Sequence, residues 1–423
     1  GNEAANNGGG MYNNFESQPV ITNATFETNQ ALLGGGVYND NSNASFDTVT
    51  FFKNTTLFNG GGMYNINSSP SLVNITFSQN GASGTGGGMH NSNSHPTLTN
   101  VTFSENGGLF GAGMYNTSDS SPKLVNTLIA NSIGSADCFN SSTSLDPGSS
   151  NNLIENSDNA CGLVNGVNGN IIGSDPNLGL LQNNGGSTQT HALLAGSPAI
   201  DAGTSTGCPA TDQRGIHRPL NGDSFSGIKC DIGSFETFPA TPVFSDVPAN
   251  HWAVSFIERL YAFGITGGCS TTPLSYCPDN QVTRAQMAIF LEKGIHSPFF
   301  TPANVFPTFT DTVGHFAEDW IEALKNDGVT SGCGAGIYCP ENPVTRAQMA
   351  IFLLKAKHGA SFSPPPATGT FADVPTSHFA AAFIEQLAAE GITSGCAVGL
   401  YCPENAVTRD QMAVFLVKAF DLP

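Results

Sequence analysis

The chain has 423 residues, a formal net charge of −19 and only 11% charged residues. The length allows two or more domains, and a charge content far below the usual quarter is atypical of helical cytosolic enzymes. Because no basic stripe offsets the acidic charge, nucleic-acid binding is excluded as a function.

Ten cysteines, an even number without a Cys-x-x-Cys motif, fall into close pairs along the chain. This pattern predicts disulfides and an oxidising compartment; zinc is the alternative, but structural zinc sites normally show recurring Cys-x₂₋₄-Cys pairs. The expected pairs are Cys138/Cys161, Cys208/Cys230, Cys269/Cys277, Cys333/Cys339 and Cys396/Cys402.

No apolar run approaches the ~18 residues that span a bilayer. The chain starts at Gly1, without Met and without a signal peptide. We therefore expect a processed, exported, extracellular protein without a transmembrane segment.

The first 130 residues contain a repeat of 25 or 26 residues. Each unit has a glycine triplet (Gly-Ala-Gly in the last unit), a small apolar-aromatic-Asn step, and a strand-like run that ends in an aromatic residue. The triplets begin at Gly8, Gly34, Gly60, Gly86 and Gly111, and the aromatic residues are Phe26, Phe51, Phe77 and Phe103, with Ile129 in the last unit. Units this short cannot bury a core alone, so they predict stacked coils of a right-handed parallel β-helix.

Equivalent residues of stacked coils should form columns. We expect the Phe column to stack internally, with Met11, Val37, Met63, Met89 and Met114 beside it. The column Tyr12, Tyr38, Tyr64, His90 and Tyr115 should face outward, since one position tolerates His. The column Asn13, Asn39, Asn65, Asn91 and Asn116 suits a corner with left-handed backbone and amide bonds between coils. The glycine triplets permit a tight bend.

Residues 131–240 lose the period. Their densest polar cluster contains Asp201, Asp212, Asp231, Glu236, Arg214 and Arg218. We interpret it as a salt-bridged cap on the last coil rather than a catalytic site. Gly196-Ser-Pro-Ala-Ile-Asp-Ala-Gly203 and Cys230-Asp-Ile-Gly-Ser-Phe-Glu236 resemble the ending of bacterial right-handed β-helix surface proteins of the polymorphic outer-membrane and choice-of-anchor types. That resemblance implies a fold and an export route.

After a Pro/Thr linker at 237–242, three units of about 60 residues follow. Each begins with a Phe-x-Asp motif at Phe244, Phe309 or Phe371, continues through an amphipathic helix and a cysteine loop, and ends with Thr-Arg-x-Gln and a second helix. Thr and Gln are typical of a capping box. Arg at the first helical position is disfavoured by the helix dipole, so its threefold recurrence favours an anion site.

These units resemble the S-layer homology (SLH) module, whose pattern includes F-x-D-V, H-W, G-I-x-x-G and T-R-A-E and which usually occurs in threes. The resemblance implies all-α modules that hold acidic, often pyruvylated, cell-wall polysaccharide in grooves. Its implied ligand-facing residues are Arg284, Arg346, Arg409, Trp252, Gly267, Gly332 and Gly395. Gln replaces the motif Glu in all copies and Phe replaces two Trp residues, so binding of a neighbouring protein subunit remains an alternative.

No Ser/His/Asp, phosphate-loop or zinc-protease pattern is present in the sequence, and we expect no cofactor and no metal. The predicted domains are 1–240 (β-helix with closing segment) and modules at 241–300, 301–366 and 367–423. The predicted function is a structural bacterial surface protein, and the alternative is a wall-anchored polysaccharide lyase or hydrolase, or an adhesin.

The first repeat starts only seven residues into the chain, so its strand edges have no predicted cap. We expect another copy to cover them head to tail, which gives a filament or lattice. A monomer that has lost the cap of a longer precursor is the alternative.

Overall fold

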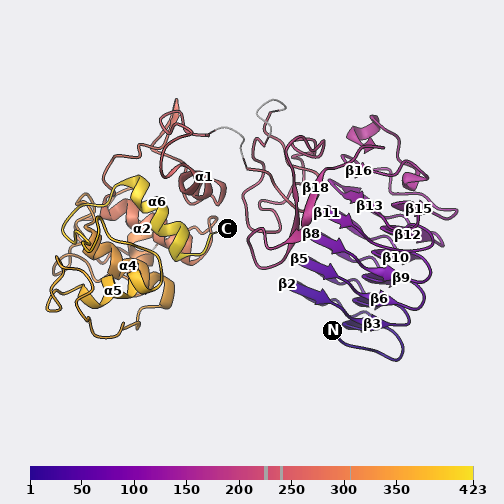
Figure 1. Cartoon of the computed structure of the whole chain (residues 1–423), viewed down its shortest axis with the longest axis horizontal. Coiled ribbons are helices and arrows are strands. Elements are labelled where there is room, and N and C mark those ends of the chain that lie inside the picture. Colours follow the sequence, from indigo (N-terminus) through magenta and orange to yellow (C-terminus); the bar gives the residue numbers. More distant parts are fainter. Residues whose placement is uncertain (223–226, 239–241, 305, 423) are drawn as a thin grey trace. The chain divides into compact units, whose positions relative to one another are not determined.

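The computed structural model describes residues 1–222, 227–238, 242–304 and 306–422. The chain divides into two compact units, 1–240 and 241–423. The first is a parallel β-solenoid, and the second contains short helices (Figure 1). Among the described residues, no helix is both long and apolar enough to cross a membrane.

The solenoid consists of three parallel sheets whose strands come from successive repeats. Residues one repeat apart are paired in register, for example Met11 with Val37 and Phe26 with Phe51. The first sheet contains β1 (Met11–Asn14), β4 (Val37–Asp40), β7 (Met63–Ile66), β10 (Met89–Ser92), β12 (Met114–Thr117) and β15 (Cys138–Asn140). The short third sheet contains β3 (Gln30–Ala31), β6 (Thr55–Thr56) and β9 (Gly81–Ala82).

The second sheet is the longest, and Figure 1 shows its strands β2, β5, β8 and β11 side by side. Its members are β2 (Val20–Glu27), β5 (Ser45–Phe52), β8 (Ser71–Ser78), β11 (Thr97–Ser104), β13 (Lys123–Val125), β14 (Leu128–Ala130), β16 (Leu153–Ile154) and β17 (Ile171–Ile172). Coil stacking therefore continues beyond residue 130, although the sequence period becomes irregular there. Two 3₁₀ turns, η1 (Ala160–Gly162) and η2 (Val167–Gly169), lie between the last strands.

Two predicted core columns are confirmed. Phe26, Phe51, Phe77 and Phe103 are buried and stack with ring centroids 5.0, 4.5 and 4.5 Å apart. The Met column belongs to the same core cluster, with Met11 only partly buried. The ladder follows from the repeat, because in-register pairing places each ring directly above its predecessor.

The expectation that the Tyr column faces outward is wrong for its middle members. Tyr38, Tyr64 and His90 are 6%, 9% and 5% exposed, whereas Tyr12 is 49% exposed. Neighbouring rings in this column stack on one another, so each ring covers the next. The glycine corner also lies against them, since a Cβ added at Gly34 would come within 2.8 Å of the Tyr38 side chain.

The predicted Asn column forms a ladder of side-chain amides. Each Nδ2 donates to the Oδ1 of the next coil, at 2.8 to 2.9 Å, from Asn13 to Asn140. The expected left-handed backbone is wrong, because these residues lie within strands; positive φ occurs instead at Asn41, Asn67 and Asn93. A second buried ladder, missed in the sequence, contains Asn29, Asn54, Asn80 and Asn106.

The closing segment covers the side of the second sheet, which corrects the prediction that it caps the last coil. It includes β18 (Leu178–Gln182) paired antiparallel with β19 (Thr190–Leu193). The outward-facing threonines of β5, β8 and β11 bind it: Thr50 Oγ1 donates to Gln189 O, Thr76 Oγ1 donates to Gln213 Oε1, and Thr102 Oγ1 accepts from Ser234 N.

The expected ion pairs form in the closing segment, and they are buried. Arg214 is 2.6 Å from Asp212, and Arg218 is 3.0 Å from Glu236, with both pairs almost fully shielded from solvent. Arg218 also donates to the carbonyls of Asp231 and Gly233. Burial raises the pKa of Asp231 to about 6, but its carboxylate oxygens accept backbone N–H bonds, as expected of a structural group.

The second unit contains two helices from each module and a small hairpin. The helices are α1 (Val254–Ala262), α2 (Arg284–Ile295), α3 (Glu318–Asn326), α4 (Arg346–His358), α5 (Ala381–Ala389) and α6 (Arg409–Ala419). Strands β20 (Ser270–Thr271) and β21 (Leu274–Ser275) form the hairpin, so the unit is helical with local β structure rather than all-α. Its helices pair between modules, as α1 with α6, α2 with α3, and α4 with α5.

All ten cysteines form disulfides. Cys138–Cys161 and Cys208–Cys230 lie in the first unit. Cys269–Cys277, Cys333–Cys339 and Cys396–Cys402 each close a loop before the second helix of a module.

Candidate functional site

The three modules meet in a ring of backbone hydrogen bonds. Val282 N donates to Val407 O, Val407 N to Val344 O, and Val344 N to Val282 O, each at 2.9 Å. Each valine comes two residues before the arginine that begins α2, α4 or α6. The Val-Thr-Arg segments therefore lie together at the centre of the unit, with one arginine from each module.

Each of these arginines binds the next module in a cycle. Arg284 Nε donates to Tyr338 O, and the Tyr338 hydroxyl donates back to Arg284 O. The same reciprocal pair joins Arg346 with Tyr401 and Arg409 with Tyr276. Each guanidinium carbon also lies 4.6 to 4.7 Å from the centroid of its partner tyrosine ring.

The arginines are more buried than their expected ligand-facing role implied. Arg284, Arg346 and Arg409 are 4%, 5% and 4% exposed. Burial is the main cause that lowers the pKa of each guanidinium. Yet Nη2 of each is buried without a hydrogen-bond partner, so each holds a cationic donor that a ligand could use. A buried donor without a partner lowers the stability of the fold, so its presence in all three modules points to a ligand that pairs with it.

The predicted capping box is complete only in module 2, where Thr345 Oγ1 accepts from Gln348 N and Gln348 Oε1 accepts from Thr345 N. In module 1 Thr283 accepts from the Gln286 N–H, but the side chain of Gln286 does not bond back. In the third copy Thr408 instead donates to Asp410, whose carboxylate also accepts from the Gln411 N–H. The prediction is wrong there because the acidic side chain in the first turn competes for the same groups.

The Asp of each Phe-x-Asp motif holds the tyrosine loop. Asp311 Oδ1 and Oδ2 accept from the N–H groups of Tyr338 and Cys339 at 2.8 and 2.7 Å. Asp246 and Asp373 make the same bonds in their modules. The motif thus positions the tyrosine that binds the arginine of the preceding module in the cycle.

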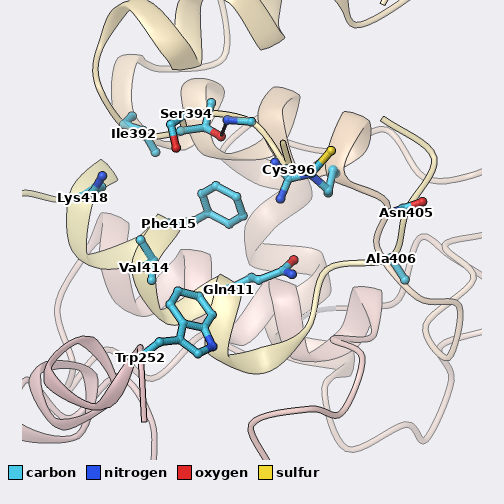
Figure 2. A pocket seen from close by; sticks show the side chains of 13 residues that line it. Trp252, Ile392, Ser394, Cys396, Asn405, Ala406, Gln411, Val414, Phe415 and Lys418 are labelled. Carbon is cyan, nitrogen blue, oxygen red and sulfur yellow. Dashed lines mark hydrogen bonds between the residues drawn. The ribbon is translucent and has the colours of Figure 1, made fainter. Parts of the chain in front are cut away.

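A groove of about 300 Å³ lies beside Arg346, with walls from all three modules. Figure 2 shows Phe415 between Trp252 and Ser394, with Lys418 towards one end and Asn405 towards the other. Gln411 also lines it, and its Oε1 is buried without a partner.

A second groove, of about 360 Å³, lies beside Arg409. It repeats the first groove at equivalent positions, which are Phe316 for Trp252, Gln286 for Gln411, Phe290 for Phe415 and Lys293 for Lys418. Among the described residues, neither groove is lined by Asp or Glu, although the whole chain has 33 acidic and only 14 basic residues.

The aromatic walls are exposed. Trp252, Phe316 and Phe379 occupy the same place in their modules and are 60%, 70% and 67% exposed. Trp252 differs from the others in that its Nε1 donates to Asp410 Oδ2 at 3.0 Å. Modules 1 and 2 have Ala285 and Ala347 at the position of Asp410. The one tryptophan among the three aromatic residues therefore faces the one module that has an acceptor for its N–H.

The three glycines expected to face the ligand are not all at equivalent positions of their modules. Gly332 and Gly395 have φ of +96° and +97° and pack against Phe309 and Phe371. Their equivalent is Gly268, with φ +89° and Phe244 as neighbour, and not Gly267, beside which a Cβ would meet nothing. The assignment of Gly267 was one residue out of register, although Gly267 does line the second groove.

Sequence reasoning missed the tyrosines that bind the arginines and the lysines that line the grooves. Tyr276, Tyr338 and Tyr401 precede the second cysteine in every module, a recurrence that could have identified them. Lys293 and Lys418 likewise recur nine residues after the motif arginine.

The S-layer homology domain matches three stretches, 243–288, 308–350 and 370–413, so the chain carries three such domains after its β-solenoid. It is similar to an S-layer protein of Bacillus thuringiensis subsp. finitimus, 30% identical over 176 residues that cover 41% of this chain and 21% of that protein. S-layer protein sap of Bacillus anthracis is 29% identical over 180 residues, 42% of this chain and 21% of that protein. An endoglucanase of Bacillus sp. (strain KSM-635) is 28% identical over 173 residues, 40% of this chain and 18% of that enzyme.

The chain thus spans about a fifth of the length of these relatives. The three S-layer homology domains and the S-layer relatives indicate an extracellular location at the cell surface.

Proposed function

We propose that the second unit binds an acidic polysaccharide of the cell envelope in the grooves between its modules, and so attaches the protein to the cell surface. One observation carries this proposal: each described groove joins a buried guanidinium that has an unpaired Nη2 to an exposed aromatic ring. The other groove residues and the relatives' S-layer names agree with it.

Charge favours an anionic ligand. Each groove has one arginine and one lysine but no carboxylate among its described lining residues, in a chain of net charge −19. A carboxylate or ketal acid on a sugar could accept from Nη2, and a charge-assisted bond in a shielded groove is stronger than its surface counterpart. An acidic protein would be repelled by an anionic polymer everywhere else, so the grooves would also set the docking position.

The aromatic residues that line the grooves suit the apolar face of a sugar ring. Trp252 and Phe316 each line a groove together with an arginine and a lysine. The apolar C–H face of a pyranose can stack on such a ring while its charged substituent reaches the guanidinium. Because both described grooves take residues from all three modules, binding should require modules 241–300, 301–366 and 367–423 together.

We assign the solenoid a structural role. The dense polar cluster of the closing segment is buried and internally hydrogen-bonded, which leaves Asp212 and Glu236 committed to arginine partners. This cluster therefore gives no support to the lyase or hydrolase alternative. Assembly with other copies into a filament or lattice remains part of the proposal, supported by the S-layer relatives. Sedimentation tests it, and a stable monomer at high concentration would contradict it.

Co-sedimentation tests the attachment. The full chain is mixed with isolated cell-wall sacculi that retain their acidic polysaccharide, and in parallel with sacculi stripped of it. We expect the protein in the pellet only with the unstripped walls. Equal pelleting with both would contradict the proposal and direct attention to the peptidoglycan or to a protein partner.

A further inference from the structure

A small cluster of metal-ligand side chains joins modules 1 and 2, and none of its residues lines either described groove. Glu292 and His296 lie one turn apart at the end of α2, and Asp327 follows α3 of the next module. His296 Nε2 is 2.7 Å from Asp327 Oδ2 and 3.4 Å from Glu292 Oε2. One ligand atom from each residue lies within 4.8 Å of the others.

Glu292 is the unexplained member of this cluster. Its side chain is 0% exposed, and neither carboxylate oxygen has a hydrogen-bond partner. An ionised carboxylate that is buried without hydrogen bonds is costly, and a bound cation would offset that cost.

The other modules show that the fold does not need this carboxylate. His358 and Glu390 repeat the His296–Asp327 pair between modules 2 and 3, with Nε2 to Oε1 of 2.8 Å. There Leu354 occupies the position of Glu292, and in module 3 Val417 does. Both apolar side chains are buried. The interface can thus be packed with an apolar residue at this position, so packing alone does not explain Glu292.

We propose that Glu292, His296 and Asp327 bind a divalent transition-metal ion, with Zn²⁺ as the probe ion, which clamps module 1 to module 2. One imidazole and two carboxylates are a common ligand set for such ions, and a water could complete a tetrahedral site. The site is separate from the proposed polysaccharide grooves and does not depend on them.

Two features of the surroundings favour a cation. His296 and Asp327 are the C-cap residues of α2 and α3, so the negative ends of two helix dipoles converge there. His296 and Asp327 are 37% and 32% exposed, which gives the ion access from solvent. Phe300 stacks on the imidazole at 4.3 Å between ring centroids and restrains its orientation.

The spacing requires a small adjustment. Ligand atoms of a tetrahedral zinc site lie about 3.4 Å apart, given bond lengths of about 2.1 Å. The His296–Glu292 distance already matches this value, and the His296–Asp327 distance is shorter. The Asp327 carboxylate would move outward by less than 1 Å, about the size of a small side-chain rotation at a partly exposed residue.

Isothermal titration with Zn²⁺ tests the site. The full chain, disulfides intact, is first dialysed against EDTA and then against metal-free buffer. We expect one strong zinc site per chain. E292L copies the residue of module 2 and should weaken that site by about tenfold or more while the protein stays folded by circular dichroism. H296A should do the same, which keeps the test valid if one variant folds poorly.

The matched control is H358A, which alters the equivalent pair that lacks the third carboxylate. It should leave zinc binding unchanged. With Co²⁺ as a spectroscopic probe, the wild-type protein should show visible absorption bands of low-coordinate cobalt, and E292L should not. Absence of a strong site in the wild-type protein, or equal zinc binding by wild type, E292L and H296A, would overturn the proposal. Loss of the site in H358A alone would also overturn it, since the ion would then be bound between modules 2 and 3.

Discussion

Arg284 and Tyr338 bind each other twice across a module boundary. The guanidinium Nε donates to the tyrosine backbone carbonyl at 2.7 Å, and the phenol hydroxyl donates to the arginine backbone carbonyl at 2.9 Å. The same exchange recurs at the other boundaries, so Arg346 and Arg409, which line the two described grooves, also hold the modules in their ring.

The reciprocal bond predicts the cost of Y338F. The variant keeps the aromatic ring against Arg284 but removes the hydroxyl that donates to the Arg284 backbone carbonyl. Tyr338 is fully buried, so water cannot replace this hydrogen bond. We expect a loss of about 1–2 kcal/mol in unfolding free energy of the second unit, measured by urea denaturation. F316A, which removes an exposed ring from the same module, is the control and should change stability little. Equal stability of Y338F and wild type would show that the bond contributes nothing.

The Phe ladder predicts a large effect at one solenoid position. Phe77 stacks between Phe51 and Phe103 and is 0% exposed, so F77A removes a ring from the centre of the core. We expect a loss of about 3–5 kcal/mol in unfolding free energy. F58A is a matched control on the same solenoid, because Phe58 is 55% exposed. Similar losses in both variants would contradict the assigned core.

Much of the solenoid could be predicted because the same residue types recur at a fixed spacing along the sequence. The Phe and Met columns follow from steps of 25 or 26 and from the requirement that equivalent residues align. The buried ladder of Asn29, Asn54, Asn80 and Asn106 has the same step, so its signal was present but was not followed. The position of the closing segment could not be read in this way, since contacts such as Thr102 with Ser234 join aperiodic, distant residues.

The site was predicted in part for a similar reason. The recurrence of Arg284, Arg346 and Arg409 indicated a common role, and the helix-dipole argument indicated an anion. Their burial was not predictable from a helix position alone, because it depends on a tyrosine from another module. Only the folded ring brings these tyrosines to the arginines.

Glu258 predicts a pH dependence of stability. Burial raises the pKa of this carboxyl to about 7, although it accepts a bond from Val243 N. Between the unfolded pKa of about 4.3 and the folded value, the folded state holds a proton that the unfolded state has released. Its contribution to stability is therefore present at low pH and is lost as pH rises through the folded pKa.

E258Q removes this titration. Relative to the variant, the wild-type protein should lose about 1–2 kcal/mol between about pH 4.5 and pH 7, a figure reduced because the side chain is only partly buried. Thermal unfolding across this range measures it. E385Q is the control, since backbone N–H bonds lower the pKa of Glu385 to about 2 and it stays ionised in the folded state. The difference in unfolding free energy between E385Q and wild type should become constant above about pH 5.5. A wild-type-minus-E258Q difference that does not change with pH would contradict the account.

Charge in the grooves predicts that polysaccharide affinity falls with salt. Lys418 lines the first groove, so K418Q should weaken binding about two- to fivefold at low ionic strength and less at high ionic strength. K357Q is the control, because Lys357 pairs with Glu390 and Asp421 and does not line either described groove. Binding that does not respond to salt would argue against an anionic ligand.

The most direct test of the central claim is isothermal titration of soluble acidic wall polysaccharide into W252A/F316A/F379A and into wild type. These side chains are largely exposed and the structure assigns them no core role, so the triple variant should keep its melting temperature within about 2 °C. We predict that its affinity falls by about tenfold or more, because each groove loses the ring on which a sugar would stack. Unchanged affinity in a folded triple variant would contradict the claim that the grooves hold the polysaccharide.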